Sequence, residues 1–198
     1  MRIQQIKQIY NDFSVSYDRE VKRDLRYTAY LRVPELVIRH LDAAAPEILD
    51  LGCGTGLSSL LFFKSGCRVT GIDGTRAMIE RAGRLPYRKL ICQDLEKSLR
   101  VKDLSFDAAV MIGVMEYLDD PVALLARVRG KLRRGGLFGL TVPQRSSLYS
   151  EAGLGSYYKK EMEPAMTEAG YSILECERIV GIEEGARRTY YWNYVLKS

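Results

Sequence analysis

Three closely spaced glycines and a later aspartate are the residues whose types and spacing best fit ligand binding. Gly52, Gly54 and Gly56 follow the short apolar run 47–51, which is typical of a buried strand. Glycine lets the backbone turn tightly and brings a ligand into van der Waals contact with the main chain. Asp73 ends the next apolar run, where its carboxylate can accept hydrogen bonds from both hydroxyls of a ribose.

The glycine spacing and a second aspartate distinguish two kinds of ligand. A dinucleotide-binding fingerprint requires its third glycine at position 57, where this chain has Leu57. Asp50 lies two residues before Gly52. Its carboxylate would repel an incoming pyrophosphate and would suit a cationic sulfonium and ammonium ligand. The residues therefore argue against a nicotinamide-dependent oxidoreductase.

Strands that alternate with helices from residue 47 onward would position these residues. Apolar runs predict strands over 47–51, 68–72, 88–92, 106–112 and 136–142. Helical patterns lie between them, over 57–64, 75–81 and 119–132. This alternation indicates right-handed βαβ units and a parallel sheet covered on both faces. Ligands of such sheets bind at the carboxyl ends of the strands, where the strand order reverses.

The two ends of the chain extend this plan. Helical patterns precede the first strand over 3–13, 18–25 and 34–41, and Pro34 suits the first turn of the last one. A polar loop over 144–155 is followed by a predicted helix and two strands, over 157–169, 171–180 and 189–196. The short segment between the last two strands favours an antiparallel hairpin, which gives seven strands in all.

Five motifs follow one another along the chain: residues 50–56, Gly71-Ile72-Asp73, Gln93-Asp94-Leu95, residues 106–110 and Gly135-Gly136-Leu137. In type and order they resemble the motifs of the class I S-adenosylmethionine (SAM)-dependent methyltransferases. The resemblance covers about residues 47–142. It implies an α/β fold with a Rossmann-like seven-stranded sheet, mostly parallel with an antiparallel final strand, and helices on both faces. We expect one methyltransferase domain over 1–198, with an N-terminal helical lid over 1–45 and the Rossmann-like core over 46–198.

The resemblance also implies which residues would bind SAM. Asp73 would bind the ribose hydroxyls, and Asp94 would bind the adenine amino group. Further contacts, to the methionine portion, the adenine and the reacting methyl group, would come from Asp50, Gly52, Cys53, Gly54, Gly74, Met78, Leu95, Ile112 and Gly113.

The N-terminal segment is similar to the leading helices of small-molecule methyltransferases. The similarity rests on Tyr17-Asp18 and on residues 31–36, and it is greatest to the group typified by the Williams–Beuren-region methyltransferase-like protein. In that group these helices fold over the cofactor as a lid. The resemblance implies that Tyr17 closes on the site and that Arg32 meets the methionine carboxylate. The alternative is that both are ordinary packing residues.

Glu116 and Tyr117, just beyond the fourth predicted strand, are the candidate catalytic residues. Either one can orient a methyl acceptor or accept its proton, whereas the alternative for Glu116 is a helix-end or salt-bridge residue. The single histidine, His40, ends a predicted helix, and we expect it at the surface rather than at the methyl group. Methyl transfer from SAM mainly needs proximity and alignment, so the missing histidine base slightly favours nitrogen over an unactivated hydroxyl.

Several features of the sequence limit which methyl acceptors and partners we expect. The chain has neither the Asn/Asp-Pro-Pro-Tyr motif nor a Pro-Cys pair, which argues against DNA. The short segment 143–156 leaves little room for a large substrate, and Tyr149, Tyr157 and Tyr158 lie in or beside it. We therefore expect direct in-line transfer to a nitrogen or oxygen of a small molecule, with S-adenosylhomocysteine (SAH) as the product.

Two alternatives stay open at this point. A net charge of +5 suggests an RNA or protein methyltransferase that docks through basic patches. The absence of an obvious base suggests a SAM-binding regulatory subunit without turnover. Widely spaced cysteines and one histidine give no metal-site spacing, and no apolar run reaches bilayer length. We expect a cytoplasmic protein without a metal or a membrane partner, and the sequence does not indicate its oligomeric state.

Overall fold

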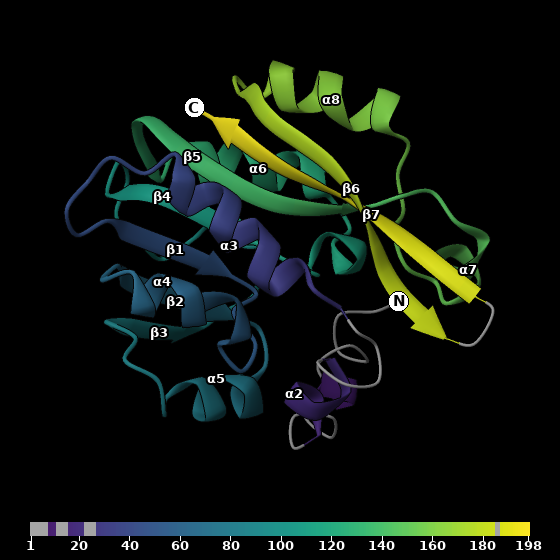
Figure 1. Cartoon of the computed structure of the whole chain (residues 1–198), viewed down its shortest axis with the longest axis horizontal. Helices are drawn as coiled ribbons and strands as arrows, with labels where there is room; N and C mark the ends of the chain where they lie inside the picture. The colour runs from purple at the N-terminus through teal and green to yellow at the C-terminus, as the bar shows by residue number, and fades with distance from the viewer. Residues whose placement is uncertain (1–7, 11–15, 22–26, 185–186) are drawn as a thin grey trace.

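A seven-stranded sheet runs through the molecule (Figure 1). The computed structural model describes residues 8–10, 16–21, 27–184 and 187–198. The strand order is β3-β2-β1-β4-β5-β7-β6, with β1 to β5 parallel and β7 antiparallel to both of its neighbours. The strands are β1 Glu47–Leu51, β2 Arg68–Asp73, β3 Lys89–Cys92, β4 Phe106–Met111, β5 Leu132–Pro143, β6 Ser172–Glu184 and β7 Arg187–Lys197. The predicted fold class is confirmed.

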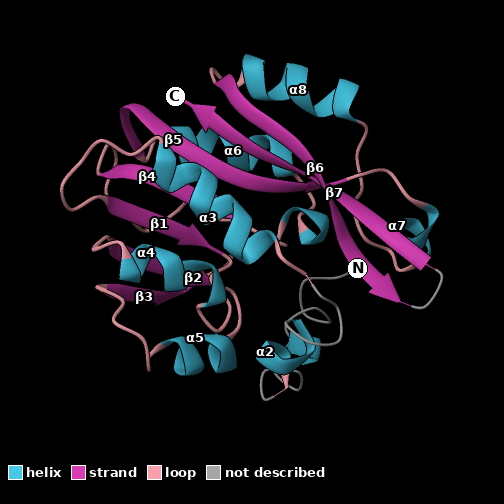
Figure 2. Ribbon diagram, viewed as in Figure 1, coloured by secondary structure: helices cyan, strands magenta, loops and turns pink. Residues whose placement is uncertain are grey.

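The residues of β1 show why both faces of the sheet carry helices. All five are buried, and successive side chains of a strand point to opposite faces. Ile48 packs with Val37 on one face, whereas Leu49 packs with Leu124 on the other. Figure 2 shows the helices in front of and behind the strands. The first face is covered by α3 (Ala29–Arg39) and α4 (Leu60–Lys64), and the second by α6 (Pro121–Arg129) and α8 (Lys159–Glu168).

The strand order reverses next to β1, because β2 lies on one side of it and β4 on the other. A crevice is expected at the carboxyl ends of the strands at such a point. The loops that follow β1, β2 and β4 meet there, and a short helix follows each loop. They lead to η2 (Leu57–Ser59), α5 (Arg76–Ala82) and η3 (Met115–Tyr117).

The prediction that Pro34 lies in a first helical turn is wrong. Helix α3 begins at Ala29, so Pro34 lies inside it. A proline there cannot donate the hydrogen bond that the helix would otherwise make. Burial explains why the helix forms nevertheless: Ala29, Val33 and Leu36 are fully buried against the sheet on both sides of the proline.

The C-terminal half contains more regular structure than the sequence predicts. Helix α7 (Ser147–Glu151) lies in the predicted polar loop, where the Ser146 side chain accepts a hydrogen bond from the Leu148 N–H and caps the helix. Strand β5 begins four residues earlier than predicted, at Leu132. The β6–β7 pairing continues past the end of β5 as far as Glu184 and Arg187.

The described N-terminal residues include only part of the predicted leading helices. Residues 8–10 are helical, and α2 spans Tyr17–Arg19; the rest of the predicted helices 3–13 and 18–25 lies largely outside the described residues. Within the described part of the chain, every helix is too short or too polar to cross a membrane.

Candidate SAM-binding site

A pocket with about 720 Å³ of open space lies at the carboxyl ends of β1, β2 and β4. Eleven of the fifteen residues in its wall are predicted site residues: Tyr17, Gly52, Gly54, Asp73, Gly74, Met78, Asp94, Leu95, Ile112, Gly113 and Tyr117. The structure thus brings together residues that lie up to a hundred positions apart in the sequence.

Part of the pocket wall comes from residues 52–56, which we call the glycine loop. Gly52 and Gly54 have φ angles of 70° and 53°, in a region that favours glycine. A Cβ on Gly52 would lie 2.3 Å from a methyl carbon of Val114, which also lines the pocket. Any side chain at position 52 would therefore push the loop and the segment after β4 apart.

Asp73 is held at the edge of the pocket by main-chain amides. One carboxylate oxygen accepts a hydrogen bond from the Gly54 N–H at 2.9 Å, and the other accepts one from the Thr75 N–H at 2.8 Å. The side chain is buried at 9% exposure. The first bond ties the glycine loop to the end of β2, so the orientation of the carboxylate and the shape of the loop depend on each other.

Asp94 and Leu95 form another part of the wall, after β3. The Asp94 carboxylate accepts a hydrogen bond from the Glu96 N–H at 3.0 Å, which is a local turn of the kind that aspartate favours. Leu95 is buried and lies with Met78 in the same wall. A carboxylate that shares a pocket wall with two apolar side chains suits an aromatic ring that carries an amino group.

Asp50 does not line the pocket, although the sequence predicts that it faces the ligand. One of its oxygens accepts hydrogen bonds from the hydroxyls of Ser58, Ser59 and Tyr87, at 2.7, 2.6 and 3.3 Å. The strand alternation that points Ile48 toward α3 and α4 also points Asp50 that way. Burial raises its pKa to about 6. Asp50 therefore fastens the segment that follows the glycine loop.

Cys53 also lies outside the pocket wall. Its side chain is buried at 3% exposure, and burial raises the pKa of its thiol. The N–H groups of Gly52 and Cys53 donate to the carbonyl oxygen of Ile72, at 2.7 and 3.0 Å. These two amides hold the loop on β2 and are already used inside the protein.

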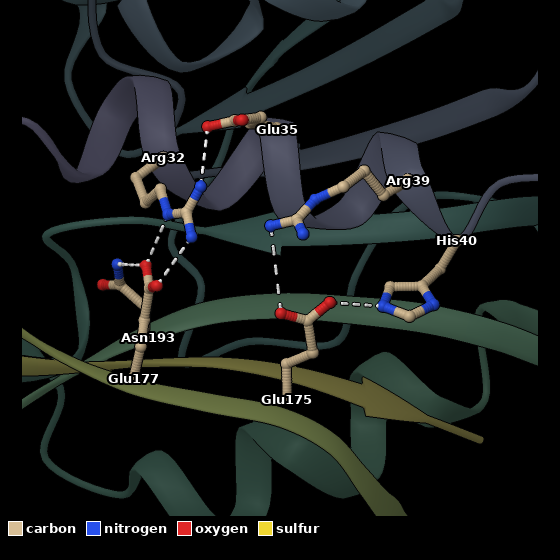
Figure 3. Close-up of polar contacts among 7 residues, drawn as sticks. All are labelled: Arg32, Glu35, Arg39, His40, Glu175, Glu177 and Asn193. Atoms are coloured by element: carbon tan, nitrogen blue, oxygen red, sulfur yellow. Dashed lines mark hydrogen bonds and ion pairs between the residues drawn. The ribbon is translucent and has the colours of Figure 1, made fainter.

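Arg32 lies away from the pocket, on the side of α3 that faces β6 and β7 (Figure 3). Its guanidinium donates to both carboxylate oxygens of Glu177, at 2.8 and 2.9 Å, and to Glu35 at 2.9 Å. The Arg32 hydrogen bonds lower the pKa of Glu177. The structure therefore does not bring Arg32 to a ligand carboxylate. His40 caps the C-terminal end of the same helix, where it is exposed and lies 2.6 Å from Glu175, outside the pocket wall.

The two candidate catalytic residues occupy different positions. Tyr117 lies in the pocket wall, and its hydroxyl oxygen accepts a hydrogen bond from Tyr10 at 2.7 Å. Glu116 lies behind the wall at 5% exposure, and it accepts a hydrogen bond from the Tyr191 hydroxyl at 2.8 Å. Burial raises the pKa of Glu116.

Four wall residues were not predicted: Tyr10, Thr75, Val114 and Leu118. Thr75, Val114 and Leu118 adjoin predicted residues in the sequence, so the motifs gave a signal for them. Tyr10 belongs to the predicted N-terminal helical pattern, but nothing in that pattern shows that its hydroxyl meets Tyr117.

Comparisons with known proteins agree with this geometry. Residues 49–140 match the family described as "Methyltransferase domain". Among curated proteins, the ubiquinone biosynthesis O-methyltransferase of Xanthomonas oryzae is 29% identical over 142 residues, 67% of this chain and 58% of that protein. The chain thus spans less than two thirds of the length of this relative.

Solved structures show the same fold. The Burkholderia thailandensis 1,6-didemethyltoxoflavin-N1-methyltransferase, solved with SAH, has a TM-score of 0.72 at 20% identity over 98% of this chain and 89% of that one. The cyclase SpnF has a TM-score of 0.71 at 20% identity over 84% of this chain and 80% of that one. Residues 49–140 are thus similar to a methyltransferase domain, and the chain has the fold of the solved methyltransferase.

Proposed function

We propose that this protein binds SAM and transfers its methyl group to a nitrogen or oxygen atom of a small molecule, with SAH as the product. The observation that carries the proposal is the Asp73 carboxylate at the edge of the pocket. Two main-chain amides orient it beside the glycine loop, where the two hydroxyls of a ribose would meet it. Hydrogen bonds to a charged acceptor contribute about 1.5–3 kcal/mol each.

The other wall residues fit the remaining parts of SAM. Asp94 would accept the hydrogen bond of the adenine amino group, and Met78 and Leu95 would pack beside the ring, with Gly74 at its edge. The bare loop at Gly52 and Gly54 leaves room for the methionine portion. Ile112 and Gly113 would line the floor near the methyl group. All these residues share one pocket, which supports this arrangement.

Methyl transfer requires these residues to position the reactants and does not require them to transfer a proton to the cofactor. SAM supplies a methyl group already activated on a cationic sulfur. The pocket wall contains three tyrosines from the N-terminal segment and η3, namely Tyr10, Tyr17 and Tyr117. There they would exclude water and align an acceptor for in-line displacement. Exclusion of water also strengthens electrostatic interactions inside the pocket.

A small-molecule acceptor is supported by the short segment between β5 and α8. It holds only the five-residue helix α7 and its flanking turns, so it adds no second domain for a large substrate. The curated relative named above is an O-methyltransferase, and the solved neighbour is an N1-methyltransferase. The similarity of this chain to both supports transfer to a small molecule without choosing between oxygen and nitrogen.

The alternative of an RNA or protein methyltransferase that docks through basic patches has less support once the contacts of its cationic side chains are considered. The net charge of +5 suggested it, and residues 127–134 form one basic cluster of the chain. Arg127 and Arg129 donate to the carbonyl oxygens of Leu95 and Gly170. Two further cations of the cluster, Lys131 and Arg133, pair with aspartates, Asp103 and Asp107 respectively. Four of the cationic side chains thus serve the fold, which weakens the case for RNA or protein docking.

The test is a calorimetric titration of the purified protein with SAM, SAH and NADH in parallel. Micromolar binding of SAM and SAH without binding of NADH would support the cofactor assignment. A radiolabelled methyl-transfer screen over small amines and phenols would then test turnover, and transfer to any of them would exclude a regulatory subunit without activity. A cytoplasmic location is part of the proposal, since all four cysteines are unpaired and unpaired thiols are typical of reducing compartments.

A further inference from the structure

Glu116 is a buried carboxylate without a counter-charge in the described part of the chain. Its Oε1 accepts the hydrogen bond of Tyr191, whereas its Oε2 has no hydrogen-bond partner there. Burial raises its pKa, and only its own backbone N–H and the Tyr191 hydroxyl act in the other direction. An unpaired buried carboxylate is costly unless it is protonated or meets a cation.

Tyrosine side chains surround this carboxylate. Tyr149 donates a hydrogen bond to the Tyr191 hydroxyl at 2.5 Å, and that hydroxyl donates to Glu116. The Tyr27 ring lies 5.4 Å from the Tyr191 ring, edge to face. Burial, and after it the negative charge of Glu116, raise the pKa of all three hydroxyls. We call Tyr27, Tyr149 and Tyr191 the tyrosine cluster.

The tyrosine cluster adjoins the methyl end of the SAM pocket. Gly113 lines the pocket floor, and a Cβ added to Gly113 would lie 3.5 Å from the Tyr27 hydroxyl. Tyr117, the neighbour of Glu116 in the sequence, lines the same pocket. The carboxylate therefore lies just behind the wall that an acceptor must face to reach the methyl group.

We propose that Glu116 and the tyrosine cluster form the acceptor subsite and that the acceptor is a small molecule with a protonated amine. This inference rests on the proposed methyltransferase function. An ammonium group would supply the positive charge that Glu116 lacks, and aromatic faces attract cations. A neutral hydroxyl would leave the buried charge unbalanced. The curated relative that acts on oxygen is thus a guide to the fold and not to the acceptor atom.

An ammonium nitrogen must lose a proton before it can accept the methyl group, and the proposed subsite contains a group that can take this proton. The ammonium gives one proton to the Glu116 carboxylate, whose raised pKa suits this role. The freed electron pair of the nitrogen forms the bond to the methyl carbon while the bond from that carbon to sulfur breaks. The sulfur keeps the electron pair of the broken bond, which leaves neutral SAH and a methylated ammonium product.

Matched pairs of amines and alcohols test the inference. The protein saturated with SAH is titrated at pH 7.5 with benzylamine, 2-phenylethylamine and n-butylamine, and with the alcohol of the same skeleton in each case. At least one amine is expected to bind about tenfold or more tightly than its alcohol, the size of one charge-assisted hydrogen bond. Equal binding of every pair, or binding of no amine, overturns the inference.

Two variants show whether the preference depends on Glu116. Glu116→Gln keeps an acceptor for the Tyr191 hydroxyl but removes the charge, and it is expected to abolish the preference for amines. Glu175→Gln, a carboxylate of β6 that pairs with His40 at the surface, is the matched control and should keep it. A preference that survives in Glu116→Gln overturns the inference. Absence of SAH binding to the wild-type protein contradicts the proposed function itself, so the two failures are distinguishable.

Discussion

At the scale of single residues, the site depends most on Asp73. Its carboxylate is already oriented by the Gly54 and Thr75 amides. Asp73→Ala is expected to weaken SAH binding by about 2–4 kcal/mol, because two charge-assisted hydrogen bonds to the ribose are lost. Calorimetric titration measures the change. The control is Asp103→Ala, an exposed aspartate paired with Lys131, which should bind SAH like the wild type. An unchanged affinity in Asp73→Ala would contradict the ribose assignment.

Asp50 makes a different prediction, about stability. Its pKa is raised to about 6 in the folded protein from an ordinary value near 3.8. A raised carboxyl pKa stabilises the fold below about pH 4, and that contribution is lost as the pH rises through about 6. Asp50→Asn cannot ionise, so its free energy of unfolding should rise relative to wild type between pH 4 and 7, by about 3 kcal/mol at most. Urea unfolding at several pH values checks this, and a pH-independent difference would contradict it.

The positions of site residues were predictable where the backbone itself carries the signal. Glycines with positive φ and the aspartates that end strands are local features, so Gly52, Gly54, Asp73 and Asp94 could be placed from the sequence. The direction of Asp50 follows from strand alternation and from its two serine partners, a pairing that the motif does not encode.

At the scale of elements, α3 is tied to β6 through Arg32 and Glu177. Both side chains are about one third exposed, so solvent screens the ion pair and limits its contribution to about 1 kcal/mol. Arg32→Ala should lower the free energy of unfolding by that amount and leave the SAH affinity unchanged. Urea unfolding and calorimetry on one preparation measure both. A tenfold or greater loss of SAH affinity would instead assign Arg32 to the methionine carboxylate.

The packing of α3 on β5 depends on a glycine. A Cβ on Gly139 would lie 2.4 Å from Val37 and 2.8 Å from Val33, so Gly139→Ala should destabilise the protein by about 1–3 kcal/mol through overpacking. Gly130→Ala is the matched control, because its Cβ would meet only a carbonyl oxygen at 3.5 Å. Thermal unfolding of both variants checks the difference, and equal midpoints would show that α3 does not lie against Gly139.

The elements were predictable to different degrees for physical reasons. Short buried strands such as β1 are visible as apolar runs. The start of α3 was misplaced because tertiary burial extends the helix past a proline. The start of β5 was misplaced because Leu132, before the glycine pair, already pairs with Phe106 of β4. The partner of Arg32 lies 145 positions away, a distance at which sequence spacing gives no signal.

At the scale of the whole molecule, the sheet order explains why one pocket collects so many motifs. The reversal beside β1 places the ends of β1, β2 and β4 together, and each of these strands carries one of the resembling motifs. The fold leaves the reaction open, because the cyclase SpnF shares it. The fold could thus be predicted from the motifs, whereas the acceptor depends on Glu116 and on tyrosines from three separate segments.

Calorimetric titration of the wild-type protein with SAH, with NADH as the parallel control, tests most directly whether the pocket binds SAM. SAH is expected to bind with micromolar affinity at one site per chain, and NADH is expected to give no heat. Absence of SAH binding by a folded sample, or binding of NADH in its place, would contradict the assignment of the pocket to SAM.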